Sequence, residues 1–402
     1  MPQVIIWHPD GRRVLRGAHG WPAVTSEKPG QLKETAERQF NLQLWPLHEG
    51  GFTPNREILP QFRALTADPP PGLTWEEADS TSVLHGREWQ RPSWPEWATQ
   101  LLDTALDRVG WKRIGDLSPI HSWDLATVIR AETNAGRVYF KMAETGREAS
   151  VTALLSQTLP GLVPPLLCTD VEKGVLVSAS GGELLDGVGQ VEAWEEVAQR
   201  LAQFQQKGDP VALAALGCPT YPLAEMAERI DAFLGDLPTL RDWGVEEESL
   251  STLTEARPAV RAAFRNLTAL GLPDLPAHRD AHPRNALHGE RGGVWFDWSE
   301  AASAAHPFMD AGWFLWWTLG KPNLPVSQPY TDLSTRLVST YLTALGCPDA
   351  SKLFLKGVSL ALLHRAVIYD SRFRHWEGTV HGWRPLYVPY YLRQAVRELI
   401  RL

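Results

Sequence analysis

Three side chains close together in the sequence have the chemistry needed for phosphoryl transfer. Asp280 is followed by Asn285 and, after a short apolar run, by Asp297. Transfer of a phosphoryl group needs positioning and charge neutralisation more than covalent help from the protein. Mg²⁺ prefers oxygen ligands, so the Asp297 carboxylate and the Asn285 amide oxygen suit a metal on a nucleotide's phosphates. Asp280 is then left to accept the proton of a hydroxyl nucleophile.

The sequence around these groups predicts how they are held. Residues 294–296 are an apolar run that predicts a buried strand, and the glycine pair at 292–293 predicts the turn before it. Such a strand would place Asp297 rigidly at its end. Residues 278–285 read His-Arg-Asp-Ala-His-Pro-Arg-Asn, which matches the pattern of the kinase catalytic loop.

A lysine and a glutamate upstream are of the types expected around the same phosphates. Residues 138–142 alternate as a strand does, and Lys141 lies within them, like the strand lysine that reaches a nucleotide's α- and β-phosphates. Glu148 opens a helix predicted over 147–159, and a helix glutamate can hold such a lysine towards phosphate. Simpler explanations stay open, because exposed strand lysines are common and a helix N-terminus favours Glu.

These residues give the chain a resemblance to the aminoglycoside phosphotransferase and choline kinase-like family, whose fold is similar to that of protein kinases. The resemblance rests on residues 280–285, on Asp297-Trp298 and on residues 305–310, and it covers about residues 110–400. Arg279 replaces the family's usual glycine. The resemblance implies Mg²⁺-dependent transfer of the γ-phosphoryl group of ATP or GTP to a hydroxyl of a small molecule, and it leaves that acceptor undefined.

The resemblance also implies nucleotide contacts in the first half of the chain. Residues 118–124 take the place of the glycine-rich loop that covers a nucleotide, and Ser122 is their candidate phosphate ligand. Val177 and Ala179 belong to a predicted strand and turn that resemble the hinge between the two lobes. Backbone groups there would meet the edge of the adenine ring. An ordinary strand and turn would also explain this segment.

Three residues are implied as structural support for the catalytic loop. His278 and His282 flank Asp280, and they are expected to order the loop by hydrogen bonds rather than bind metal, because the proline at 283 argues against a helix there. Asp310 is expected to brace the loop through His278 or nearby backbone. Helix N-terminal charge is an equally good and compatible explanation of Asp310.

Aromatic residues crowd the carboxy-terminal third. Their faces would suit an ammonium group on an acceptor, but packing within helices is the favoured explanation. They are Trp313, Trp316, Trp317, Trp376, Trp383, Tyr387, Tyr390 and Tyr391.

The order of elements predicts an α+β, bilobal, kinase-like fold preceded by an added unit. We predict a small α/β unit over 1–75, a linker and helix over 76–110, a strand-rich lobe with the hinge over 111–182, and a helical lobe with the catalytic loop over 183–402. Helices are predicted in the last segment at 221–234, 258–269, 308–318, 331–344, 351–368 and 388–401.

The added unit has a weak second resemblance. Residues 34–42 resemble the helix of Nudix hydrolases but lack the paired glutamates that hold the metal. We therefore predict a structural or regulatory unit with a Nudix-like fold. Hydrolysis of a nucleoside diphosphate derivative by this unit stays as a less favoured alternative.

Composition narrows the class of protein. The 402 residues carry a net charge of −8 without a basic tract, which argues against a nucleic-acid partner. No apolar run approaches membrane-spanning length, and three widely spaced cysteines predict reduced thiols in a cytoplasmic protein. Two alternatives to a small-molecule kinase stay open, a nucleotide-binding regulator without transfer activity and, less favoured, a protein kinase.

Overall fold

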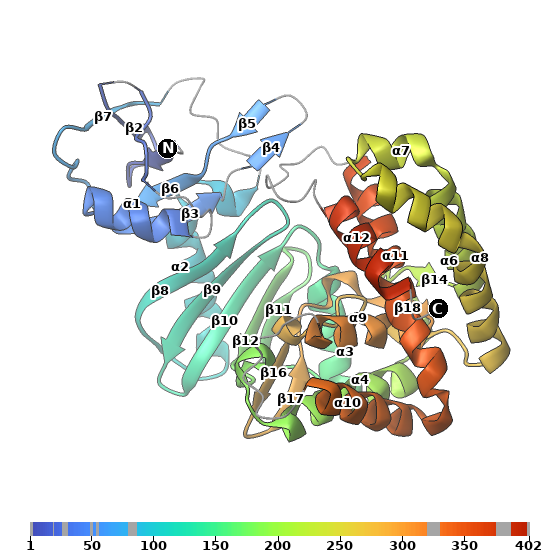
Figure 1. The fold of residues 1–402 in the computed structure, drawn as a ribbon. Helices are drawn as coiled ribbons and strands as arrows, with labels where there is room; N and C mark the ends of the chain where they lie inside the picture. Colours follow the sequence, from blue (N-terminus) through green and yellow to red (C-terminus); the bar gives the residue numbers. More distant parts are fainter. Residues whose placement is uncertain are drawn as a thin grey trace. The chain divides into compact units, whose positions relative to one another are not determined.

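The computed structural model describes residues 3–18, 20–25, 31–48, 51–53, 56–78, 87–319, 330–374 and 387–399. They form two compact units (Figure 1). The first contains the described residues of Met1–Gly146 and Leu167–Ala179, and the second contains Arg147–Leu166 and the described residues from Ser180 onwards. The first unit is rich in strands and the second is mainly helical, so the predicted α+β class is confirmed.

The first unit begins with a five-stranded sheet of order β3-β6-β1-β2-β7. Strands β1 and β6 are parallel and the other neighbours are antiparallel. The sheet strands are β1 (Ile5–Trp7), β2 (Arg13–Arg16), β3 (Leu44–His48), β6 (Gln61–Ala64) and β7 (Thr74–Glu77), with helix α1 (Leu32–Phe40) and the separate pair β4 (Gly51–Thr53) and β5 (Arg56–Ile58).

The two faces of this sheet lie in different cores. Because side chains alternate along a strand, Val4 and Ile6 pack with α1 on one face. Ile5 and Trp7 belong to a second core, which also contains one face of helix α2 (Trp94–Arg108) and Phe140. The added amino-terminal sheet therefore shares a core with the segment that follows it.

A second five-stranded sheet, of order β11-β12-β10-β9-β8, completes the first unit. Its strands are β8 (Arg113–Ser122), β9 (Ala126–Thr133), β10 (Gly136–Ala143), β11 (Leu166–Asp170) and β12 (Val175–Ala179). Val138, Phe140 and Met142 of β10 point into the shared core. Lys141, opposite Val128 of β9, therefore lies on the other face and is partly exposed.

Helices build the second unit around one large core. Helix α11 packs against α9 and α12, and α4 packs against α10. The helices are α3 (Arg147–Thr158), α4 (Val191–Lys207), α5 (Pro210–Ala215), α6 (Leu223–Gly235), α7 (Leu237–Asp242), α8 (Glu247–Leu270), α9 (Pro307–Leu319), α10 (Tyr330–Leu345), α11 (Ser351–Arg374) and α12 (Tyr387–Leu399).

Short strands and loops connect several helices of the second unit. One small sheet has the order β13-β16-β17 and another the order β14-β18-β15. Their bounds are β13 (Glu183–Leu184), β14 (Thr220–Tyr221), β15 (Leu275–Ala277), β16 (Ala286–Gly289), β17 (Gly292–Trp295) and β18 (Ala302–Ala305). The loop from β15 to β16 contains the predicted catalytic residues.

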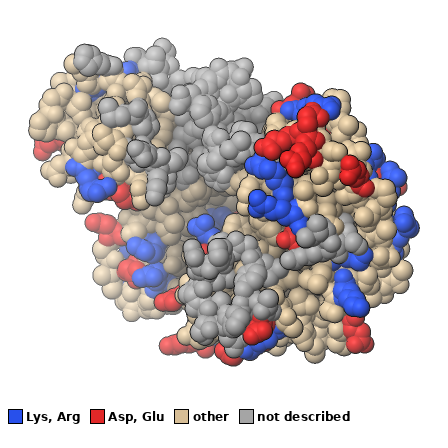
Figure 2. All heavy atoms as spheres, viewed as in Figure 1, with Lys and Arg blue, Asp and Glu red and all other residues tan. Residues whose placement is uncertain are grey.

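The surface carries charges of both signs. Figure 2 shows acidic and basic side chains in small mixed groups on the face in view. None of the helices in the described part of the chain combines the length and the apolar character needed to cross a bilayer.

Candidate active site

Asn285 and Asp297 lie at the same end of the β16–β17 hairpin. Ala286 pairs with Trp295, and one step further the Phe296 N–H donates to the Asn285 carbonyl at 3.0 Å. The hairpin therefore brings the two predicted metal ligands onto neighbouring strand ends. The predicted strand is confirmed, although β17 ends at Trp295, one residue earlier than expected. The predicted turn at the glycine pair is wrong, because Gly292 and Gly293 already belong to β17 and the turn lies at 290–291.

The side chain of Asn285 has a defined orientation. Its amide nitrogen donates to the Asp280 carbonyl at 3.0 Å and to the Asp280 carboxylate at 3.2 Å. Since the NH₂ group is used in this way, the amide oxygen points away from Asp280. This is the orientation that a neutral oxygen ligand to a cation requires.

Asp297 adopts an uncommon backbone conformation. Its φ of 60° and ψ of 61° lie in the left-handed region, where most residues with a side chain are disfavoured. One carboxylate oxygen accepts a hydrogen bond from the Ser299 hydroxyl at 2.8 Å. The turn into the short helix η5 (Trp298–Glu300) thus fixes this carboxylate at the end of the hairpin.

Asp280 is surrounded by donors. Its carboxylate accepts hydrogen bonds from the guanidinium of Arg365, the indole N–H of Trp313 at 3.3 Å and the Asn285 amide. The Nε2 atom of His282 lies 3.6 Å from the same carboxylate. These donors fix the direction of the Asp280 carboxylate.

A buried ion network continues from Arg365. Its side chain is only 3% exposed, and it also donates to Glu300 at 2.9 Å. Arg372 binds the other oxygen of Glu300 at 2.7 Å. Burial lowers the pKa of Arg365 to about 10, so the guanidinium stays charged at neutral pH. The network links α11 to the loop before η4 (Pro283–Asn285) and to η5.

The catalytic loop is tied to α9 by Asp310. The buried carboxylate of Asp310 accepts the backbone N–H groups of His278 at 2.9 Å and Arg279 at 2.8 Å. The fully buried ring of His278 contacts the Phe296 carbonyl through Nε2 at 2.9 Å. Burial lowers the pKa of His278 and raises that of Asp310. His282 caps η4 by accepting the Arg284 N–H at 3.2 Å through Nδ1.

Because its ring is buried, His306 is expected to make the free energy of unfolding smaller as the pH falls. It is 1% exposed and its Nδ1 accepts the Phe308 N–H at 3.3 Å, while burial lowers its pKa to about 4. An unfolded histidine has a pKa of about 6.5. Between these values the unfolded chain binds more protons, so His306 lowers the free energy of unfolding by up to about 3 kcal/mol as pH falls from about 6.5 to 4.

The variant His306→Asn tests this expectation, because asparagine keeps an acceptor without titrating. Urea unfolding at a series of pH values should give the variant a shallower loss of stability below about pH 6.5 than wild type. Equal slopes in the two proteins would contradict the assignment. His278 and the buried His364 are present in both proteins, so their contribution is common to the comparison.

The segment 118–124, which takes the place of the glycine-rich loop, consists of the end of β8, which continues to Ser122, and the start of the β8–β9 turn. Ser122 is buried, and its hydroxyl donates to the Leu47 carbonyl of the added sheet at 3.0 Å. This hydrogen bond joins β8 to β3, which disfavours Ser122 as a phosphate ligand.

The turn after β8 is held by the added amino-terminal segment. The carboxylate of Asp124 accepts hydrogen bonds from His48 at 3.0 Å and from Gln90 at 2.9 Å, and Trp89 donates to the Trp123 carbonyl at 2.6 Å. His48 and Gln90 are each 1% exposed. The added segment thus fixes the conformation of the β8–β9 turn, a role that the sequence alone did not predict.

The two hinge candidates differ in their positions. Val177 is fully buried in the middle of β12, opposite Phe140 of β10 and with β11 on the other side. Its backbone is therefore enclosed by the sheet and is poorly placed to meet a base. Ala179 is the last residue of β12, where the sheet ends, and it stays a candidate.

Lys141 and Glu148 lie in different units. Lys141 is in β10 of the first unit, and Glu148 is 3% exposed in the first turn of α3 in the second. Their ion pair, and the approach of Lys141 to the residues of the catalytic loop, stay predictions.

A cavity with aromatic walls opens beside Asp280, and sequence reasoning had favoured simple packing for the aromatic residues that line it. Its volume is about 320 Å³, within the range of small-molecule sites. It is lined by Asp280, His282, Arg284, Asn285, Trp313, Trp317, Tyr369, Tyr387 and Tyr391. Trp376 and Trp383 lie outside the described residues.

Comparisons with known proteins agree with this geometry. A model described as the phosphotransferase enzyme family matches residues 116–345. No curated protein sequence matches the chain. Among solved structures, a choline kinase from Cryptosporidium parvum Iowa II is 13% identical with a TM-score of 0.53, and 75% of this chain and 95% of that chain are covered.

Two further structures have the same fold at similarly low identity. The choline kinase of Streptococcus pneumoniae is 15% identical with a TM-score of 0.51, and 76% of this chain and all of that chain are covered. An aminoglycoside 2′-phosphotransferase in complex with GDP is 13% identical with a TM-score of 0.50, and 76% of this chain and 98% of that chain are covered.

The family model spans more than half of the chain and includes most of the β8–β12 sheet and the loop that contains Asp280. The resemblance drawn from the motifs is therefore confirmed. This protein belongs to the phosphotransferase enzyme family and has a kinase-like fold.

Proposed function

We propose that this protein transfers the γ-phosphoryl group of ATP or GTP to a hydroxyl group of a small molecule, with Mg²⁺ as cofactor. The observation that carries the proposal is the arrangement of Asp280, Asn285 and Asp297 around one hairpin end. A proton acceptor and two oxygen ligands are the protein groups that this reaction needs.

The residues at the hairpin fit a magnesium ion. Asp297 supplies one carboxylate, and Asn285 supplies an amide oxygen that points away from Asp280. One or two carboxylate or amide ligands suffice, because Mg²⁺ keeps several waters and takes its remaining ligands from phosphate. When bound there, the ion would neutralise the charge that develops on the transferred group.

Asp280 would then act on the acceptor. Its carboxylate lines the aromatic cavity and is directed by Arg365 and Trp313. A hydroxyl in this cavity would donate its proton to that carboxylate as the phosphoryl group arrives. The loose transition state demands positioning more than a strong base, so a carboxylate held in place by donors is adequate. Lys141, oriented by Glu148, would bind phosphate, and Ala179 would offer backbone groups to the base.

The cavity also suggests which acceptors to try. Its indole and phenol rings would pack on an apolar or ammonium-bearing face of the acceptor, and its volume of about 320 Å³ admits a small molecule. Structural neighbours include proteins named as choline kinases and a complex with GDP and kanamycin. A first panel should therefore contain amino alcohols, quaternary ammonium alcohols and aminoglycosides.

The test is a screen of this panel for magnesium-dependent release of ADP or GDP, with the phosphorylated product identified by mass spectrometry. Asp297→Asn should weaken binding of the magnesium–nucleotide complex at least about tenfold, since it removes the charged metal ligand. Asp242→Asn, an exposed change in α7, is the matched control and should leave binding unchanged.

Two results would contradict the proposal. One is nucleotide binding without a phosphorylated product from any acceptor, which would favour a regulator without transfer activity. The other is unchanged magnesium–nucleotide affinity in Asp297→Asn.

A further inference from the structure

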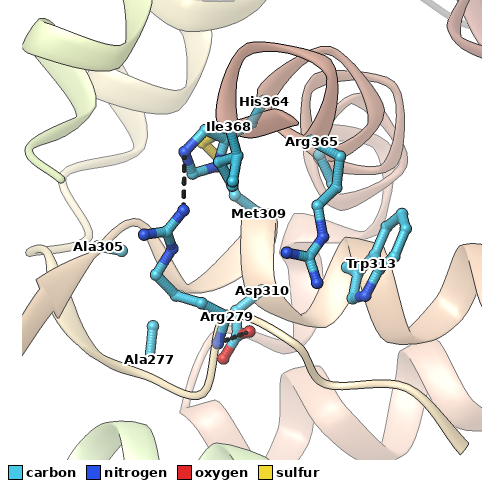
Figure 3. Close-up of a pocket in the computed structure, with 10 residues that line it drawn as sticks. Ala277, Arg279, Ala305, Met309, Asp310, Trp313, His364, Arg365 and Ile368 are labelled. Atoms are coloured by element: carbon cyan, nitrogen blue, oxygen red, sulfur yellow. Dashed lines mark hydrogen bonds between the residues drawn. The ribbon is translucent and has the colours of Figure 1, made fainter. Parts of the chain in front are cut away.

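A second, much smaller cavity lies behind the catalytic loop. Figure 3 shows that the residues around it come from the loop after β15, the start of α9 and one face of α11. Its volume is about 20 Å³, which is enough for one water molecule or one ion of similar size. Its polar walls are formed by Arg279, Asp310, His364 and Arg365.

Arg279 reaches this cavity from a backbone conformation that suits glycine. Its φ is 62°, in the left-handed region that side chains disfavour. Its N–H is held by Asp310 while its side chain runs away from that carboxylate towards α11 (Figure 3). Strain of this kind persists where the surroundings fix it, and it gathers at functional sites.

The guanidinium of Arg279 is buried, and few hydrogen-bond acceptors of the described residues lie near it. The residue is 8% exposed, and its side chain lies 3.4 Å over the Tyr221 ring. Among the residues that the structure describes, the acceptor within hydrogen-bond distance of this guanidinium is the Nε2 atom of His364, at 3.4 Å. A guanidinium has five N–H donors, so most of them are left to meet whatever occupies the cavity.

Two of the other polar walls are the ring of His364 and the guanidinium of Arg365. Burial lowers the pKa of His364 well below its usual value, as do the charges of Arg279 and Arg229, so the ring is neutral and can accept from Arg279. Arg365 uses its two terminal nitrogens for Asp280 and Glu300, and its buried Nε lacks an acceptor among the described residues.

One carboxylate also lines the cavity, but its oxygens are already used. Those of Asp310 accept two backbone N–H groups and, at 3.4 Å, the side chain of Gln205. Two buried guanidinium groups therefore face a space of ionic size. Among the described residues, the carboxylate beside Arg279 is that of Asp310, which accepts its backbone N–H and not its guanidinium. Burying a charge without a partner is costly.

We infer that this cavity is a binding site for a small monovalent anion of the size of chloride, held by Arg279 with Arg365 and the edge of His364. Water would satisfy some of the N–H groups, but it would leave the Arg279 charge uncompensated. The anion would lie directly behind the peptide that precedes Asp280, so its binding would stabilise the catalytic loop. This cavity shares Trp313 with the larger cavity, and its lining contains neither Asn285 nor Asp297, the predicted metal ligands.

The test replaces gluconate, which is too large for the cavity, by chloride at constant ionic strength and measures the Tm of the full chain. We expect a saturable rise in Tm of about 1–3 °C in the wild type. Arg279→Gly should remove this rise, because it deletes the guanidinium while suiting the backbone at φ 62°. Arg261→Gln, at an exposed arginine of α8, is the matched control and should keep the rise.

A direct measurement accompanies the titration. Crystals of the wild type grown in bromide should show an anomalous scattering peak beside the Arg279 guanidinium, and crystals of Arg279→Gly should not. Equal chloride responses of wild type and Arg279→Gly would overturn the inference, and so would wild-type crystals without a bromide peak in the cavity.

Discussion

Replacing Asp280 by asparagine is expected to lower kcat by about 10²- to 10⁴-fold, the range that a positioned acid or base contributes. Asparagine keeps the shape of the side chain and can still accept from Trp313 and Arg365. It cannot take up the acceptor's proton as a carboxylate does. Because Asn285 and Asp297 are unchanged, the affinity for the magnesium–nucleotide complex should change by no more than a few-fold.

Steady-state kinetics with the best acceptor, together with calorimetric titration of the magnesium–nucleotide complex, measure the two effects separately. Asp242→Asn again serves as the control for an exposed change of Asp to Asn. Wild-type kcat in Asp280→Asn would exclude Asp280 as the proton acceptor. A loss of nucleotide affinity as large as the loss of kcat would instead assign Asp280 to metal binding.

The strand before Asp297 was predictable because its signals are local. A glycine pair, a short apolar run and an aspartate follow one another in residues 292–297, and β17 with Asp297 at its end follows directly from them. The hydrogen bonds from the Asn285 amide to Asp280 were not predicted, although the two residues lie only five positions apart. Short-range geometry of this kind depends little on the rest of the fold.

The start of one helix, which contains a proline, was predicted wrongly. A helix was expected over 258–269. Helix α8 instead begins at Glu247 and passes through Pro258. Leu250 and Leu253, before the proline, and Val260 after it are all buried in one core. Tertiary packing therefore outweighs the hydrogen bond that an internal proline removes.

Contacts between distant residues were beyond sequence reasoning. A hydroxyl at position 122 in a segment that takes the place of a nucleotide loop predicts a phosphate ligand, yet the Leu47 carbonyl, 75 residues earlier, accepts its proton. Arg365 lies 85 residues after Asp280 in a helix whose sequence predicts packing alone. No spacing rule connects either pair, since only the fold brings them together.

Arg365→Met is expected to lower the free energy of unfolding by about 3–5 kcal/mol, the usual effect of breaking a buried ion pair. Methionine fills a similar volume, so the main effect is electrostatic. It leaves the carboxylate of Asp280 without its guanidinium partner, while Glu300 keeps Arg372. Denaturant unfolding followed by circular dichroism measures the change.

A double-mutant cycle separates the ion pair from simple packing. If the unpaired charge of Asp280 is what destabilises Arg365→Met, adding Asp280→Asn should recover about 1–3 kcal/mol relative to the sum of the two single changes. Arg261→Met breaks an exposed pair with Asp231 and should have a much smaller effect than Arg365→Met. If the losses of unfolding free energy in Arg365→Met and Asp280→Asn were strictly additive, Arg365 would stabilise the loop by packing alone. The direction of the Asp280 carboxylate would then be set by Trp313 and Asn285.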